Sequence, residues 1–154
     1  VGLKSMSAEV FSNEFLQVAV PENWKVFLGI DAEGKATPKK LHVYKNAKSE
    51  MDIFHKAGIT ICYYEDAGQY FLIKALYDEV EEVSPFEMGN YCWSGFTCKS
   101  FGYPYIMLET SESTDRVLVM ILTENGENKI SFSDNDVQMI LKSIVAGRRE
   151  EKQS

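Results

Sequence analysis

The sequence between residues 14 and 30 reads Glu-Phe-Leu-Gln-Val-Ala-Val-Pro-Glu-Asn-Trp-Lys-Val-Phe-Leu-Gly-Ile. On both sides of Pro21, side chains alternate with a period of two, which is typical of half-buried antiparallel strands. Pro21 is expected to end the first strand, because it has no amide proton to donate to a sheet ladder. Trp24 follows and supplies a large apolar surface for a core. This stretch therefore predicts a β-hairpin that opens an antiparallel sheet.

Five further segments have the alternation or the β-branched and aromatic composition of strands. They cover residues 39–45, 58–64, 90–100, 103–110 and 116–123. The last segment is apolar without interruption, which favours a central strand buried on both faces. It is followed by an Asn-Gly turn signature at Asn125 and Gly126. Because hairpin connections dominate this order, we expect a mainly antiparallel sheet.

Two segments show helical spacing instead. Between residues 66 and 82 the apolar residues recur at intervals of one, three and four, and Pro85 is expected to stop this mid-chain helix. A second helix is expected at residues 137–145, with Ser133 or Asp134 as its N-cap and Gly147 beyond its end. The sequence thus predicts an α+β fold in which both helices pack on an antiparallel sheet of six to eight strands.

Length and charge limit the possible organisation and partners. The 154 residues predict a single domain at residues 11–147, with flexible ends at 1–10 and 148–154. A net charge of -7 argues against nucleic-acid binding, which normally requires a basic face. We expect no transmembrane segment, because no apolar run is long enough. The chain begins with Val rather than Met, so both a cytoplasmic location and an extracytoplasmic one after loss of a signal segment stay open.

The segment Val-Pro-Glu-Asn-Trp-Lys-Val at residues 20–26 resembles the start of PsbP-like domains, which have the Mog/PsbP fold. The expected mid-chain helix, the three-strand meander after it and the close at residues 133–144 are similar as well. The resemblance covers roughly residues 11–145 and is to members of uncharacterised bacterial type. It implies a non-catalytic binding or accessory module of unknown ligand, and it supplies no catalytic residues.

Few residues point to chemistry. The only histidines are His42 and His55, and the three cysteines are Cys62, Cys92 and Cys98. An odd cysteine count is not a disulfide framework, and the spacing matches no zinc motif, so we expect no metal site and no cofactor. A small enzyme with a Cys/His or Tyr/His pocket is the alternative to a binding module, because a thiol nucleophile needs a neighbouring base.

An aromatic cluster is the most distinctive candidate site. It comprises Tyr91, Trp93, Phe96, Phe101, Tyr103 and Tyr105 on two expected neighbouring strands. Alternation places Tyr91 and Trp93 on one face of their strand, and Tyr103 and Tyr105 share a face of the next. If both pairs point outward together, these four residues form an exposed patch that binds a protein, a small ligand or a second copy of the chain in a homodimer. If they point inward, they belong to the core.

Overall fold

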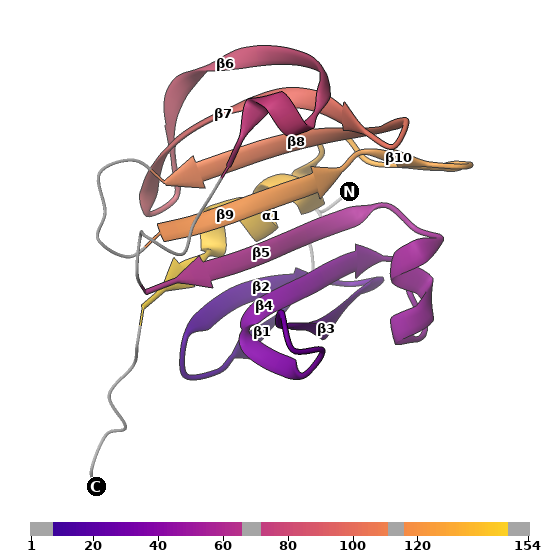
Figure 1. Cartoon of the computed structure of the whole chain (residues 1–154). Coiled ribbons are helices and arrows are strands. Elements are labelled where there is room, and N and C mark those ends of the chain that lie inside the picture. The colour runs from indigo at the N-terminus through magenta and orange to yellow at the C-terminus, as the bar shows by residue number, and fades with distance from the viewer. Residues whose placement is uncertain (1–7, 66–71, 111–115, 148–154) are drawn as a thin grey trace, which may run out of the picture.

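The computed structural model describes residues 8–65, 72–110 and 116–147 and is dominated by a seven-stranded antiparallel sheet. The strand order is β3-β4-β5-β9-β8-β7-β6 (Figure 1). These strands are β3 (Trp24–Ile30), β4 (Ala36–Lys45), β5 (Gly58–Tyr64), β6 (Asp78–Met88), β7 (Tyr91–Ser100), β8 (Tyr103–Thr110) and β9 (Arg116–Leu122). The antiparallel sheet expected from the hairpin pattern is therefore confirmed.

Smaller elements complete the fold. A three-stranded sheet is formed by β1 (Ala8–Ser12), β2 (Leu16–Pro21) and β12 (Val145–Ala146). The remaining elements are the hairpin of β10 (Glu124–Asn125) and β11 (Asn128–Lys129), the 3₁₀ helices η1 (Glu50–Phe54) and η3 (Lys74–Leu76), and the α-helix α1 (Asn135–Ser143). β1 includes residues 8–10, so these residues do not belong to the flexible end that the sequence predicts.

The expected α+β class is wrong. The structure is 60% strand and 13% helical, and α1 is the single α-helix of the described residues. Of the expected mid-chain helix, residues 66–71 lie outside the described residues, residues 74–76 form η3, and residues 78–82 are the start of β6. The expected C-terminal helix corresponds to α1.

Irregular pairing explains why β6 looks like a helix in the sequence. The register between β6 and β7 shifts twice, at 78/81 and at 83/86. Each bulge adds a residue and breaks the alternation of a regular strand. As a result Val80, Val83 and Phe86 are the half-buried residues, three positions apart, which imitates a helical period. Pro85 falls at the second bulge of this edge strand, where a missing amide proton costs no ladder bond.

The predicted hairpin of residues 14–30 is also wrong. β2 pairs with β1 and β12, whereas β3 pairs with β4. Pro21 ends β2, and the turn at Asn23, which has a φ of 73°, leads the chain from the small sheet into the large one. The alternation of each strand was interpreted correctly, but alternation is the same whichever neighbour a strand pairs with.

The main core lies between one face of the large sheet and a layer made of α1 and β2. From α1, Val137, Ile140 and Leu141 are buried in this core. Trp24, which we expected to anchor the core, is 5% exposed, and its indole Nε1 donates a hydrogen bond to Asp136 Oδ2 of α1 at 3.0 Å. α1 thus covers one face of the sheet, behind β5 and β9 in Figure 1. The opposite face has no α-helix from the described residues.

Candidate functional site

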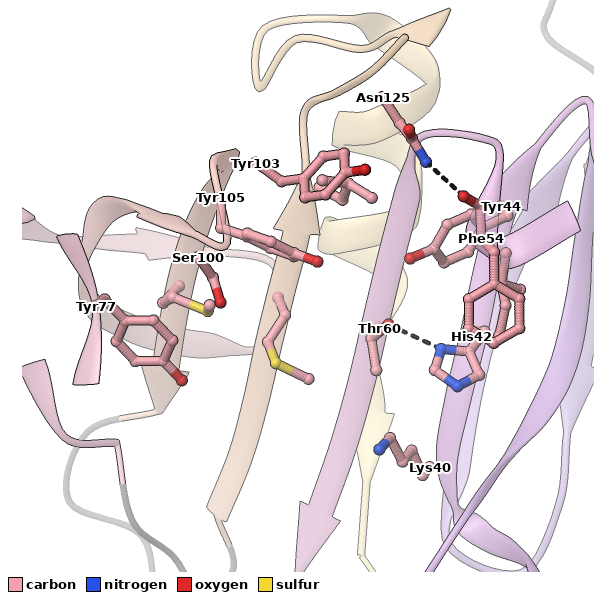
Figure 2. Close-up of a pocket in the computed structure, with 14 residues that line it drawn as sticks. Lys40, His42, Tyr44, Phe54, Thr60, Tyr77, Ser100, Tyr103, Tyr105 and Asn125 are labelled. Carbon is pink, nitrogen blue, oxygen red and sulfur yellow. Dashed lines mark hydrogen bonds between the residues drawn. The ribbon is translucent and has the colours of Figure 1, made fainter. Parts of the chain in front are cut away.

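A pocket of about 430 Å³ lies on the sheet face opposite α1. That volume is within the range of small-molecule sites, roughly 300–1,000 Å³. The lining residues are Lys40, His42, Tyr44, Ile53, Phe54, Thr60, Tyr77, Ser100, Tyr103, Tyr105, Met107, Met120, Leu122 and Asn125 (Figure 2). Most of them are aromatic or aliphatic, and the polar members are mainly hydroxyls. The pocket is therefore an apolar concavity with scattered hydrogen-bonding groups.

The floor of the pocket follows from the strand register. His42 of β4 pairs with Thr60 of β5, Thr60 with Met120 of β9, and Met120 with Met107 of β8. Paired residues in an antiparallel sheet point to the same face, so these four side chains form one row across the sheet. The two thioethers in the row give the floor an adaptable apolar surface.

A second row runs parallel to the first and contains Tyr44, Gly58, Leu122 and Tyr105. Gly58 has a packing role here, because a Cβ atom at this position would collide with the Tyr44 ring. Without a side chain on Gly58, the Tyr44 ring can lie across β5 toward the pocket. Tyr44 and Tyr105 consequently line the same pocket from strands that are not neighbours.

His42 is held as a neutral imidazole. Its Nδ1 atom lies 2.9 Å from the Thr60 hydroxyl oxygen, a hydrogen bond in which either atom can be the donor (Figure 2). Burial, with a smaller contribution from the positive charge of Lys40, lowers the pKa of His42 from 6.5 to about 4. At neutral pH, His42 therefore offers one donor and one acceptor and no charge.

The tyrosines of the pocket are shifted in the opposite direction. Burial, together with the neighbouring Tyr105 phenol, raises the pKa of Tyr44 from 10.0 to about 12, against a smaller opposing effect of a hydrogen bond with Thr60. Burial also raises the pKa of Tyr105 and of Tyr77. These phenols stay protonated at neutral pH and can each donate a hydrogen bond.

Lys40 is the only lysine or arginine among the described residues of the lining, and none of these residues carries a carboxylate. A Cβ atom at Gly29 would collide with the Lys40 stem, so the stem lies against the backbone of β3. Among the described residues, Lys40 takes part in none of the ion pairs, whereas the adjacent Lys39 pairs with Glu65 at 3.0 Å. The site thus carries one positive charge in a chain whose net charge is -7.

One wall of the pocket is fastened by two asparagines of the β10–β11 hairpin. Asn125 Nδ2 donates hydrogen bonds to the carbonyl oxygens of Phe54 at 3.1 Å and Lys56 at 3.3 Å, and Asn128 Nδ2 donates to that of His55 at 2.9 Å. These bonds hold the end of η1 at the pocket edge, where the Phe54 side chain is 66% exposed (Figure 2). Figure 2 places Tyr103 and Asn125 at one end of the pocket and Lys40 at the other.

The four aromatic residues predicted as a binding patch do not form one surface. Trp93 is fully buried on the α1 side, and its Nε1 donates to the Met88 carbonyl at 3.0 Å. Tyr91 contacts Trp93 and accepts a hydrogen bond from Ala146 N at 2.8 Å. Tyr103 and Tyr105 line the pocket on the opposite face. The structure therefore places only the second pair at the candidate site, and a binding role for these residues stays a prediction.

The cysteines and histidines are not arranged as activated pairs. His42 bonds to a hydroxyl rather than to a thiol, and His55 is exposed beyond η1. Burial raises the pKa of the Cys62 thiol to about 11. A nucleophilic cysteine needs a lowered pKa so that the thiolate is present at neutral pH. All three cysteines are free thiols, with Cys62 and Cys98 buried and Cys92 exposed.

Most of the pocket was missed by sequence reasoning. Lys40 and Tyr44 alternate with buried residues of β4, just as His42 does, so their common face could be read from the sequence. Thr60 and Met120 are in strands that read as apolar on both faces. They line one pocket only because β5 pairs with β9, and these two strands are far apart in the sequence.

Comparison with known proteins gives no family assignment. A scan against protein-family models found no matching family, and a search of curated proteins found no match. Within the described part of the chain, no helix has the length and apolar character needed to cross a membrane.

Proposed function

We propose that this protein is a non-catalytic binding module whose small-molecule ligand occupies the pocket between Lys40, Thr60 and Tyr105. The observation that carries this proposal is the pocket of about 430 Å³ on the sheet face opposite α1. Its apolar floor and ring of hydroxyls match the usual composition of ligand sites, in which a few polar groups orient a largely apolar molecule.

The ionisation of the pocket favours binding over acid–base catalysis. A general acid or base works best when its pKa lies near the operating pH. Here the pKa of His42 falls to about 4 and that of Tyr44 rises to about 12. Both shifts move away from neutrality, so the two groups exchange protons poorly at pH 7 but remain good hydrogen-bonding partners. This argues against the Tyr/His enzyme that we held as the alternative.

The resemblance to PsbP-like domains is consistent with a binding or accessory role. Because the described part of the expected mid-chain helix contains η3 and the start of β6, the resemblance rests on residues 20–26, on the meander of β7, β8 and β9, and on the C-terminal helix that corresponds to α1. We retain the PsbP-like assignment as part of the proposal, to be tested by whether the chain binds a ligand or a protein partner without turning it over.

The proposal is tested with N-phenyl-1-naphthylamine, a neutral aromatic probe that fluoresces in apolar sites. We expect saturable binding with one probe per chain. Met120→Trp places a larger side chain in the centre of the pocket floor and is expected to weaken binding at least about tenfold, since the probe and the indole compete for the same volume.

The matched control is Leu28→Trp, which adds the same indole at a strand position that is 41% exposed and outside the pocket lining. It should bind like the unmodified protein. If the Met120→Trp and Leu28→Trp variants bind the probe equally well, or if the unmodified protein binds neither this probe nor its sulfonated analogue, the pocket is not a ligand site.

A further inference from the structure

We infer that the ligand of this pocket is a small organic monoanion with an aromatic body, whose anionic group contacts the Lys40 ammonium. This inference rests on the proposed function, because it assigns a chemical class to the ligand of the same pocket. It follows from the charge, the hydrogen-bonding groups and the shape of the lining, each of which restricts the ligand separately.

The charge of the lining selects an anion. Among the described residues of the lining, Lys40 is the single lysine or arginine and there is no carboxylate, while His42 is neutral at pH 7. No ion pair from the described residues neutralises Lys40. Burial lowers the pKa of His42 and raises that of Cys62, and the positive charge of Lys40 adds to the first shift and partly offsets the second. An ammonium in a partly desolvated site gains most from a charged acceptor, because charge-assisted hydrogen bonds are about twice as strong as neutral ones.

The same lining selects a single negative charge. A dianion or phosphate would need further cations or converging backbone amides, and the remaining polar groups are neutral hydroxyls, one imidazole and one carboxamide. The rest of the protein is acidic, with a net charge of -7, so multiply charged anions are repelled at longer range. One carboxylate or sulfonate on Lys40 matches the site.

The shape and chemistry of the interior select an aromatic body. The apolar part of the floor between Lys40 and Tyr103 consists of Met107, Met120 and Leu122, whose flexible side chains can adapt to the face of a ring. Tyr44, Tyr105 and Phe54 are in position to stack on a ring or meet its edge, an interaction worth more than the buried area alone. Figure 2 shows the Lys40 amino group at one end of this surface. A ligand whose anionic group binds there would place its aromatic part over the two rows of side chains.

The test compares two probes that differ in one group. 8-Anilinonaphthalene-1-sulfonate carries the same aromatic body as N-phenyl-1-naphthylamine plus a sulfonate. We expect the anionic probe to bind the unmodified protein about tenfold more tightly than the neutral one, with the preference falling as salt is added. Lys40→Met keeps the length of the stem and removes the charge. It should abolish that preference, because the affinity for the anionic probe falls more than the affinity for the neutral probe.

Lys39→Met is the matched control. It makes the same change in net charge at the preceding residue, which points to the other side of the sheet. There the Lys39 Nζ atom pairs with Glu65 and lies 5.1 Å from the centroid of the Phe15 ring. This variant should keep the preference for the anionic probe. Equal affinities of the two probes for the unmodified protein, or an equal loss of preference in both lysine variants, would overturn the monoanion assignment.

The outcomes separate the two proposals. If the neutral probe binds and is excluded by Met120→Trp while the sulfonate confers no advantage, the pocket is a ligand site for neutral molecules and only the monoanion inference fails. If neither probe is affected by Met120→Trp, both proposals fail. Should Lys40→Met not fold, the probe preference of the unmodified protein and its salt dependence still decide the result.

Discussion

Protonation of His42 is expected to destabilise the fold in mildly acidic solution. In the folded protein its pKa is about 4, against 6.5 for an ordinary histidine. Between these two values the unfolded chain binds a proton that the folded chain does not, so stability decreases as the pH falls. The contribution of neutral His42 to the free energy of unfolding is fully present above pH 6.5 and is lost by pH 4.

The size of the effect follows from the pKa difference. A shift from 6.5 to about 4 corresponds to at most about 3.4 kcal/mol in the free energy of unfolding. His42 is only half-buried in an open pocket, and solvent screening reduces such contributions. We therefore expect about 1–2 kcal/mol.

The assay is urea unfolding at several pH values between 7.5 and 4. His42→Asn removes the titration while keeping a hydrogen-bonding nitrogen and oxygen close to Thr60. Acidic residues titrate in both proteins, so the quantity of interest is the difference between their pH profiles. The variant should lose about 1–2 kcal/mol less than the unmodified protein over this range.

The chain offers a control in its only other histidine, the exposed His55, and His55→Asn should keep the profile of the unmodified protein. Parallel profiles for the unmodified protein and His42→Asn would refute the reasoning. So would an NMR titration in which the His42 ring gains its proton near pH 6.5.

Two further predictions concern the sheet and the phenols. Gly95→Ala places a methyl group against the Met107 backbone carbonyl of the neighbouring strand, which cannot move away as a side chain could. In urea unfolding, this variant should have a free energy of unfolding about 2–3 kcal/mol lower than that of the unmodified protein. Ser94→Ala is the control, and equal stability of the two variants would contradict the clash. Tyr44 has a raised pKa of about 12, so its contribution is present below pH 10 and lost between 10 and 12. Tyr44→Phe should therefore lose about 1–2 kcal/mol less than the unmodified protein over that range, and identical alkaline profiles would count against the shift.

The sequence predicted the strands of this protein far better than their partners. β5, β7, β8 and β9 lie within one or two residues of the expected segments, because alternation and β-branched composition are local properties. Pairing is a long-range property, so β2 and β3 looked like a hairpin although they belong to different sheets. The start of β6, which the sequence predicts as helix, shows a second limit of prediction from local patterns. In a bulged strand, half-buried residues can recur at a nearly helical spacing.

The candidate site was only partly accessible for the same reason. His42 and Tyr105 could be singled out by residue type, but nothing in their sequence neighbourhoods brings them together. They share a pocket because β5 and β9 lie between β4 and β8. Trp93 shows that a residue that is conspicuous in the sequence need not belong to the site. It is buried in the core, where its indole donates a hydrogen bond to the Met88 carbonyl oxygen.

The pairing of β12 with β2 has a consequence for synthesis in the cell. Ala146 pairs with Leu16, and α1 packs against the same early strand, so the last described segment completes a layer that begins near residue 16. Contacts so distant in sequence cannot form on a partly made chain. The ribosome must therefore release residue 146 from its exit tunnel before the core can close, and until then the apolar face of the growing sheet stays open to chaperones.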